Sequence, residues 1–195
     1  MNRRSAIKIP KPEILKTALK LFSDRGYSET KMTDIAREAG LSVGALYLRF
    51  RSKEYLCLEL IQDQTRDYEE LAEAVVASCS GADEALEKYI AFCLGYAFRK
   101  RQLITLLYRE HRLHFLKPVR SAFMRSQQKL IESILHDGIR KGIMRPMDVK
   151  KMSLMIFAGL RGAIMLKLFF GIGSAPWLSK SLFDLISSGV RKGPR

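Results

Sequence analysis

The chain of 195 residues has few of the residues on which catalytic, metal and disulfide sites are built. Its three cysteines, Cys57, Cys79 and Cys93, are far apart and form no Cys-x-x-Cys pair. A disulfide framework and a cysteine-bound metal are therefore not expected, and a reducing, cytoplasmic compartment fits this usage. His111 and His114 share a helix face, but no further ligand accompanies them, so we expect no metal site. The sequence also has no glycine-rich phosphate loop and no nucleophile motif, which argues against an enzyme and against a cofactor.

The sequence lacks an apolar leader, because Met1–Glu13 is basic and contains no apolar run. We therefore expect no secretory signal. One apolar stretch, residues 152–173, is long enough to span a bilayer. It contains Arg161 and Lys167, and each charge would cost about 2.5–3.5 kcal/mol near the bilayer centre. A soluble helix buried on more than one side is the better interpretation.

Acidic residues are scarce relative to basic ones. The 34 Lys and Arg against 20 Asp and Glu give a net charge of +14, which favours a polyanionic partner, either nucleic acid or an anionic membrane surface. Residues 99–125 carry eight basic side chains and one acid, Glu110. This stretch either adds to the attraction of DNA, receives the head of an anionic ligand, or forms a solvated basic face.

Strand-like alternation is missing, whereas apolar residues recur at spacings of three and four nearly throughout. The sequence thus predicts an all-α fold. Helices are expected after Thr30 and Ser42, which would cap the second and third, and after Ser52, which would cap a long fourth. The expected ranges are 12–25, 32–39, 43–50, 53–78, 82–99, 101–114, 117–141, 148–171 and 176–191. We expect two modules, one over 1–52 and one over 80–195, joined by a linking helix over 53–79.

A helix-turn-helix is predicted over residues 32–50. Ala36 is small where the second helix must approach the first, and Gly40 lies where the chain reverses and a positive φ is convenient. Leu46 is apolar where the recognition helix must pack back onto Ile35 and Ala39. This spacing of a small residue, a glycine and an apolar residue is typical of such a unit.

The wider segment, Phe22–Leu56, resembles the DNA-binding region of the TetR family of regulators. The resemblance covers about a quarter of the chain. The matching residues are Phe22, Arg25-Gly26-Tyr27, Thr30, Asp34-Ile35-Ala36, Ala39-Gly40-Leu41-Ser42, Gly44, Leu46-Tyr47, Phe50 and Ser52-Lys53-Glu54.

The resemblance implies roles for individual residues at a DNA surface, with Ser42 at the start of the recognition helix. It places Thr33, Val43, Gly44, Ala45 and Tyr47 at base edges. It places Lys31, Tyr47, Leu48, Arg49 and Lys53 at phosphates. Leu46 and Phe50 are expected in the core, Tyr47 could also pack there, and Arg49 stands where the family often has His and could be solvated.

The resemblance extends more loosely into the second half, where Asp137–Asp148 is similar to the family's link between its seventh and eighth helices. It implies that residues 1–52 are the DNA-binding domain and residues 80–195 the effector-binding and dimerisation domain. It also implies an effector pocket, for which core packing is the alternative at each position. The candidate residues are Phe92, Cys93, Tyr96, Tyr108, Phe123, Met124, Gln127, Phe157 and Arg161. The Arg161 guanidinium is expected either to pair with an acid such as Asp184 across a dimer or to meet an anionic ligand.

The helix expected over 148–171 is apolar on two faces. One face carries Leu154, Phe157, Arg161, Ile164 and Leu168, and the other carries Met155, Gly159, Gly162, Leu166 and Phe169. Covering both faces favours a homodimer with a four-helix interface that includes residues 176–191, and a monomeric core is the alternative.

Together these patterns predict a cytoplasmic regulator of transcription that binds double-stranded operator DNA as a homodimer. We expect a repressor that a small hydrophobic or amphipathic effector, such as a fatty acyl-CoA, releases from its operator. The competing interpretation is a basic, membrane-associated helical protein, which leaves the register of Ala36, Gly40 and Leu46 unexplained.

Overall fold

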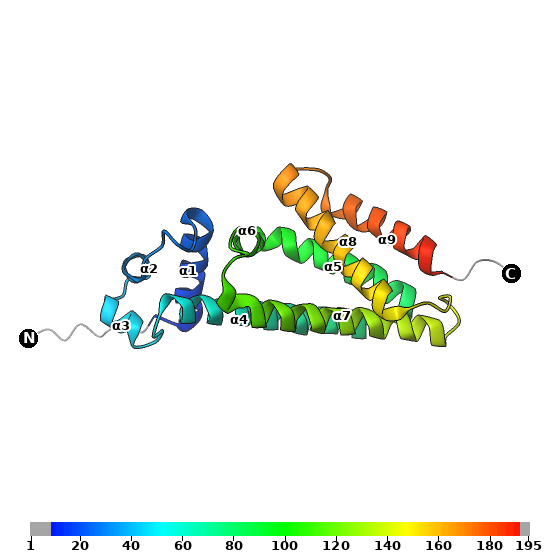
Figure 1. The fold of residues 1–195 in the computed structure, drawn as a ribbon, viewed down its shortest axis with the longest axis horizontal. Helices are drawn as coiled ribbons and strands as arrows, with labels where there is room; N and C mark the ends of the chain where they lie inside the picture. Colours follow the sequence, from blue (N-terminus) through cyan, green and yellow to red (C-terminus); the bar gives the residue numbers. More distant parts are fainter. Residues whose placement is uncertain (1–8, 192–195) are drawn as a thin grey trace, which may run out of the picture. The chain divides into compact units, whose positions relative to one another are not determined.

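A computed structural model describes residues 9–191 and confirms the all-α fold, since these residues form helices and no strand. Figure 1 shows their order along the chain. The α-helices are α1 (Lys11–Arg25), α2 (Met32–Glu38), α3 (Val43–Tyr47), α4 (Lys53–Ala77), α5 (Ala82–Arg99), α6 (Arg101–Arg109), α7 (Lys117–Arg140), α8 (Val149–Phe170) and α9 (Ala175–Val190), with a 3₁₀ turn at His114–Leu116.

Local capping explains most of the helix starts. The Ser42 hydroxyl accepts a hydrogen bond from the Ala45 N–H at 3.1 Å, and the Ser52 hydroxyl accepts one from the Tyr55 N–H at 3.0 Å. Both caps were predicted from the sequence. The Asp148 carboxylate caps α8 in the same way, by accepting from the Lys151 N–H at 3.1 Å.

Three details differ from the sequence prediction. The third helix ends at Tyr47 and not at residue 50. Thr30 does not cap α2, because its buried hydroxyl donates to the carbonyls of Leu21 and Gly26 at the end of α1. The α2 start is instead tied by the Asp34 carboxylate, which accepts from the Lys31 N–H at 3.1 Å. The sixth helix ends at Arg109 and not at residue 114, since a turn follows in which the Leu113 N–H bonds the Glu110 carbonyl.

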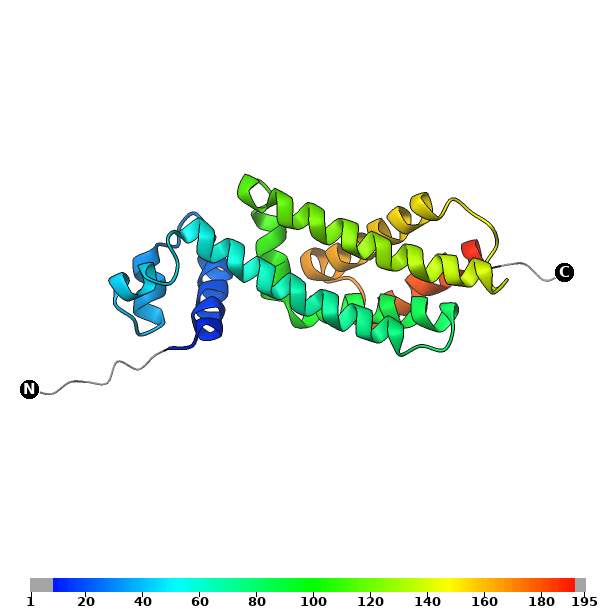
Figure 2. The same ribbon diagram turned by 90° about the horizontal axis from the view of Figure 1, so that it is seen from below.

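The described chain divides into two compact units, and each includes residues from both halves of the sequence. The first unit contains residues up to Asp63 together with Gln102–Lys117, and the second contains Gln64–Arg101 and the residues from Pro118 onward. The change from one unit to the other within α4 can be followed along the chain in Figure 2. The predicted domain bounds at 52 and 80 remain a prediction.

The second unit has a helical core centred on α5. This helix packs against both α8 and α9, and α8 and α9 also pack against each other. Leu86, Ile90 and Leu94 of α5 are buried with residues of α7 and α8, among them Leu135 and Ile156. Burial of such side chains contributes about 1.5–3 kcal/mol each, so this core stabilises the unit.

Candidate DNA-binding surface

The helix-turn-helix is built on a small, completely buried core within the first unit. Ile35 and Ala36 of α2 are inaccessible to solvent, as are Leu46 of α3 and Phe50 just after it. Gly40, between the helices, has a φ of +68°, the left-handed conformation that favours glycine. The predicted core residues and turn glycine are thereby confirmed, and they fix the orientation of α3 on α2.

The opposite face of α3 is open to solvent. Val43, Tyr47 and Leu48 are 38%, 49% and 90% exposed, although all three are large and apolar or aromatic. Nothing lies within 4 Å of the position that a Cβ of Gly44 would occupy. The backbone of α3 is therefore accessible, as a close approach to a groove would require. Lys31, Thr33 and Ser42 are also exposed.

Arg49 and Lys53, two of the predicted phosphate contacts, lie against backbone carbonyls. The Arg49 guanidinium donates to the carbonyl of Ile9. The Lys53 ammonium donates to the carbonyls of Tyr27, Ser28 and Thr30, at 2.8, 3.3 and 3.0 Å. It also lies 4.3 Å from the centre of the Tyr27 ring, within range of a cation–π interaction. A phosphate contact by either side chain remains a prediction.

The turn between α1 and α2 also receives contacts from residues far along the sequence. The Tyr27 N–H donates to the Glu110 carboxylate at 3.0 Å, and the Tyr27 ring packs on the Phe115 ring at a centroid distance of 5.6 Å. The Arg109 guanidinium donates to the Ser23 carbonyl at 3.2 Å. Burial raises the pKa of the Tyr27 hydroxyl above its usual range. This junction was not predicted from the sequence. The one sequence feature that marks it is Glu110, the single acid within the basic stretch of residues 99–125.

Five of the candidate effector residues come together in the second unit around two tyrosines that were not predicted as site residues. Tyr68 of α4 packs against the rings of Phe92, Tyr96 and Phe123, with centroids 5.0–5.2 Å apart. Its hydroxyl lies 2.8 Å from the Cys93 Sγ. Nearby in sequence on α5, the buried Tyr89 hydroxyl donates to the Gln127 Oε1 at 3.1 Å. Aromatic rings and hydrogen-bonding groups from α4, α5 and α7 are thus concentrated inside one unit.

The other four candidate effector residues are spread over both units. Tyr108 belongs to the first unit, and Met124 is 39% exposed on α7. Arg161 is exposed on α8, where its guanidinium lies 5.7 Å from the centre of the Phe157 ring. The acid suggested as its partner, Asp184, forms an ion pair at 3.4 Å with Lys180 of its own helix.

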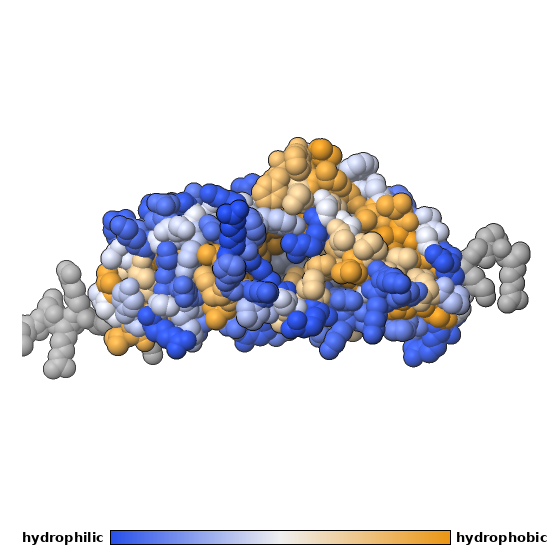
Figure 3. Space-filling model, in the orientation of Figure 1, coloured by the Kyte–Doolittle hydropathy of each residue, from blue (hydrophilic) through white to orange (hydrophobic). Residues whose placement is uncertain are grey.

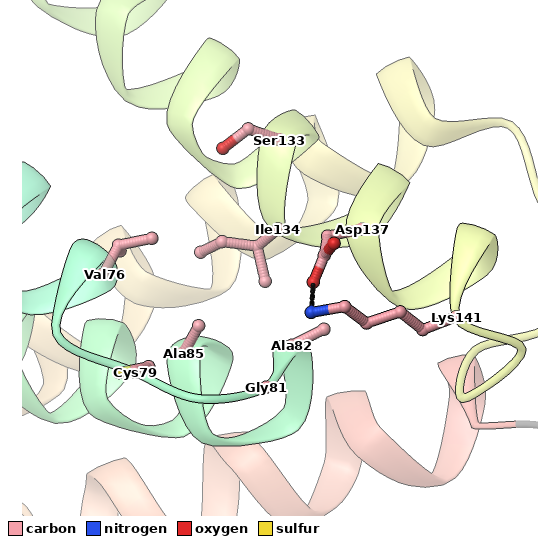
Figure 4. Close-up of a pocket in the computed structure, with 9 residues that line it drawn as sticks. All are labelled: Val76, Cys79, Gly81, Ala82, Ala85, Ser133, Ile134, Asp137 and Lys141. Carbon is pink, nitrogen blue, oxygen red and sulfur yellow. Dashed lines mark ion pairs between the residues drawn. The ribbon is translucent and has the colours of Figure 1, made fainter.

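An open cavity of about 200 Å³ lies at another place in the second unit, where α4 ends and α5 begins against α7. Figure 4 shows the Asp137 carboxylate and the Lys141 ammonium meeting at its side, 2.8 Å apart. Hydrogen bonds from Lys141 and Arg140 lower the pKa of Asp137. Its lining residues are Val76, Cys79, Gly81, Ala82, Ala85, Ser133, Ile134, Asp137 and Lys141. None of these residues was predicted from the sequence to line a ligand pocket.

Helices α8 and α9 expose much apolar surface in the single chain, which Figure 3 shows in orange over this part of the molecule. Leu154 and Met155 are exposed on α8, as are Leu166, Phe169 and Phe170 toward its end. The expected burial on two sides is therefore not complete within one chain, since the core covers the side of Ile156 and Leu160. By length and composition alone, α8 is also sufficient to cross a membrane. The core helix of a soluble protein meets the same criterion, so it does not by itself indicate a membrane span.

Comparison with known proteins places the DNA-binding segment in a family. Residues 14–60 match the model of "Bacterial regulatory proteins, tetR family". The fatty acid metabolism regulator protein of Bacillus subtilis is 26% identical over 149 residues, which are 74% of this chain and 76% of that protein. The HTH-type transcriptional repressor KstR2 of Mycolicibacterium smegmatis is 27% identical over 144 residues, 69% of this chain and 67% of that repressor.

Solved structures share the fold over nearly the whole chain. The crystal structure of the transcriptional regulator FadR from Bacillus subtilis in complex with stearoyl-CoA has a TM-score of 0.83 at 22% identity, covering 93% of this chain and 100% of that one. A putative transcriptional regulator from Saccharomonospora viridis in complex with choline also gives a TM-score of 0.83, at 21% identity, and covers 94% and 98%. At these identities the likeness concerns the fold.

Proposed function

We propose that this chain is a member of the tetR family of bacterial regulatory proteins, whose model its residues 14–60 match, and that it is a cytoplasmic, homodimeric repressor that a long-chain acyl-CoA releases from its operator. The observation that carries the DNA-binding part is the exposed face of α3 above the buried Leu46 and Phe50. A short helix held rigidly with one open face fits the major groove of B-DNA. The protein acts by occupancy and catalyses no reaction.

The proposed DNA surface consists of residues that α2 and α3 present together. Thr33 and Tyr47 supply hydroxyls, the methyl groups of Val43 and Ala45 can touch thymine methyls, and Lys31 supplies a charge for phosphates. Gly44, Ser42 and Leu48 belong to the same surface. We assign Arg49 and Lys53 an indirect part, because their donor groups lie against backbone carbonyls. With few long polar side chains on α3, sequence-dependent DNA shape contributes to the choice of operator.

A second copy of the chain is the proposed cover of the α8–α9 surface. Met155 is 60% exposed and Leu185 of α9 is 71% exposed, and exposed apolar side chains in such number mark an interaction site. Gly162 has open space where a Cβ would lie, so a partner helix can approach closely there. A four-helix interface from two copies would cover this surface, and two recognition helices would then meet two half-sites about one DNA turn apart.

The proposed effector is a long-chain acyl-CoA. A relative at 26% identity is named as a regulator of fatty acid metabolism, and a structure of the same fold contains stearoyl-CoA. The chemistry of this chain agrees, because the aromatic cluster around Tyr68 offers apolar contacts to an acyl chain. Exposed basic residues of the 99–125 stretch that belong to the same unit, such as Arg101 and Arg125, offer charges for phosphates. Binding would shift the population of conformations away from the one that fits both half-sites.

The effector proposal is tested by titrating stearoyl-CoA into the protein bound to a fluorescent operator duplex, with stearate and free CoA as separate controls. We expect release by stearoyl-CoA at concentrations where neither control acts, since both the acyl chain and the phosphates are recognised. No release at saturating stearoyl-CoA would remove the acyl-CoA proposal and leave DNA binding intact.

The second candidate function, attachment to an anionic membrane, is favoured by the composition of α8 alone. Liposome flotation beside a DNA gel shift separates the two functions. We expect the protein to shift the duplex selectively and to remain in the unbound fraction with vesicles that contain anionic lipid, at the same salt concentration. Flotation with such vesicles, without any selective shift, would favour the membrane function.

A further inference from the structure

The turn that joins α1 to α2, residues 26–30, is held on one side by a segment from the second half of the sequence. The Glu110 carboxylate accepts from the Tyr27 N–H, and the Phe115 ring packs on the Tyr27 ring. Residues 102–117 belong to the same compact unit as α1, α2 and α3. A segment expected to serve the effector domain is therefore part of the unit that carries the recognition helix.

The same turn is also held by the first residue of α4. The ammonium of Lys53 has three N–H donors, and three carbonyls of the turn lie within 2.8–3.3 Å of it. Charged hydrogen-bond partners are stronger than neutral ones, and here a cation holds carbonyls while an anion holds an N–H. The charges of Lys53 and Glu110 thus match the two ends of the backbone dipoles that they hold.

We propose that Lys53 and Glu110 form a two-sided clamp on the Tyr27 turn, and that the Glu110 side of this clamp couples residues 102–117 to operator binding. Both are positioning residues, since they act on the helix-turn-helix through the turn. The coupling part rests on the proposed function as a DNA-binding regulator. The clamp itself rests only on the contacts within one unit.

The connectivity of the chain explains why Glu110 would carry a signal. In the sequence, residues 102–117 connect α5 to α7. These two helices bear Tyr96 and Gln127 of the candidate effector cluster. A shift of either helix would pull on this segment through the covalent chain and would change the hydrogen bond between the Glu110 carboxylate and the Tyr27 N–H. Coupling between two sites is reciprocal, so operator binding must change the stability of the segment in turn.

The clamp is tested by hydrogen–deuterium exchange of the full-length protein, followed in peptides that cover residues 23–30 and 106–116, with and without saturating operator duplex. The variants are Glu110→Ala, which removes the acceptor, and Glu110→Gln, which keeps an oxygen that can accept. Glu38→Ala is the matched control, because it also removes one negative charge from the first unit, at an exposed pair with Lys20. Circular dichroism confirms that each variant is folded.

In the free protein we expect Glu110→Ala to speed exchange in residues 23–30 on the order of tenfold, as loss of a charged hydrogen bond implies. Glu110→Gln should lie between this variant and the wild type, and Glu38→Ala should match the wild type. Operator should slow exchange in residues 106–116 of the wild type and not of Glu110→Ala.

Unchanged exchange in residues 23–30 of Glu110→Ala would overturn the clamp. Equal operator protection of residues 106–116 in both proteins would overturn the coupling. A wild type that prefers no duplex would instead refute the proposed function, and with it the coupling, while the free-protein comparison would still decide the clamp.

Discussion

The Lys53 side chain, which the family resemblance places at a DNA phosphate, contacts the backbone of its own chain. Its position after the cap of α4 predicts a phosphate contact, but its ammonium lies against three backbone carbonyls. Sequence cannot reveal this, because the carbonyls are supplied by a turn whose conformation depends on Gly26 and on distant Glu110. The two roles differ in their dependence on salt.

Lys53→Met should therefore lower stability without changing the number of phosphate contacts. We expect the free energy of unfolding to fall by about 1.5–3 kcal/mol, the range for hydrogen bonds to charged groups. The slope of log affinity against log salt should equal that of Lys16→Met, a variant that removes an equally positive but exposed side chain of α1. A slope lower by about one unit than that of the Lys16 variant would instead establish a direct phosphate contact.

Cys93 yields a prediction about alkaline pH. Burial raises the pKa of its thiol to about 12, despite the hydrogen bond with Tyr68. An acid whose pKa is higher in the folded state contributes stability that is complete below the unfolded pKa near 9 and is lost as pH rises toward 12. The free energy of unfolding should fall over this range, and Cys93 accounts for at most about 1.4 kcal/mol per pH unit.

Urea unfolding at pH 8, 9 and 10 measures this loss, with Cys93→Ala as the comparison. The variant should lose less stability than the wild type between pH 9 and 10, because it has no buried thiol to ionise. Some loss should remain, because burial also raises the pKa values of Tyr68 and Tyr89. Parallel curves for the two proteins would contradict the assignment to Cys93.

At the scale of the elements, the sequence predicted the helices closely, because their signals are local. Ser42, Ser52 and the apolar spacing act within a few residues, and the ranges of α4, α5 and α7 agree with the structure within a residue at either end. Thr30 was wrongly predicted to cap α2. Its hydroxyl instead contacts the carbonyls of Leu21 in α1 and of Gly26 just after that helix. The Glu110 contact spans 83 positions, a separation that no local pattern reports.

The two leucines at the end of α3 test whether one face of this helix is structural and the other open. Leu46 is completely buried and Leu48 is 90% exposed. Leu46→Ala should lower the free energy of unfolding by about 2–5 kcal/mol, since it leaves a cavity in the helix-turn-helix core. Leu48→Ala should change it by no more than about 0.5 kcal/mol. Similar effects in thermal or urea unfolding would contradict the orientation of α3.

At the scale of the whole molecule, the sequence predicted an apolar α8, but not which of its sides one chain covers by itself. Ile156 and Leu160 face the core, whereas Met155, Leu166 and Phe169 stay exposed. The hydropathy of the helix is the same for a membrane span and for an interface between copies, so composition alone cannot distinguish them.

Gly162→Arg tests the proposed dimer without disturbing the core. Nothing lies within 4 Å of a Cβ at this position, so the single chain accommodates the side chain. Light scattering should give twice the chain mass of 22.3 kDa for the wild type and a single chain mass for the variant. Ala122→Arg, at an exposed position on α7, is the control and should stay dimeric. A Gly162→Arg protein that is as dimeric as this control would refute α8 as the interface.

The central claim is that the open face of α3 reads a DNA sequence, and a competition experiment tests it most directly. Fragments selected from bacterial genomic DNA by the purified protein would supply the preferred duplex, and its affinity would be compared with that of a scrambled duplex at one salt concentration. The account predicts a preference of at least about 10³-fold for the selected duplex, and its loss in Tyr47→Ala and Thr33→Ala together. Equal affinity for the selected and scrambled duplexes would contradict it.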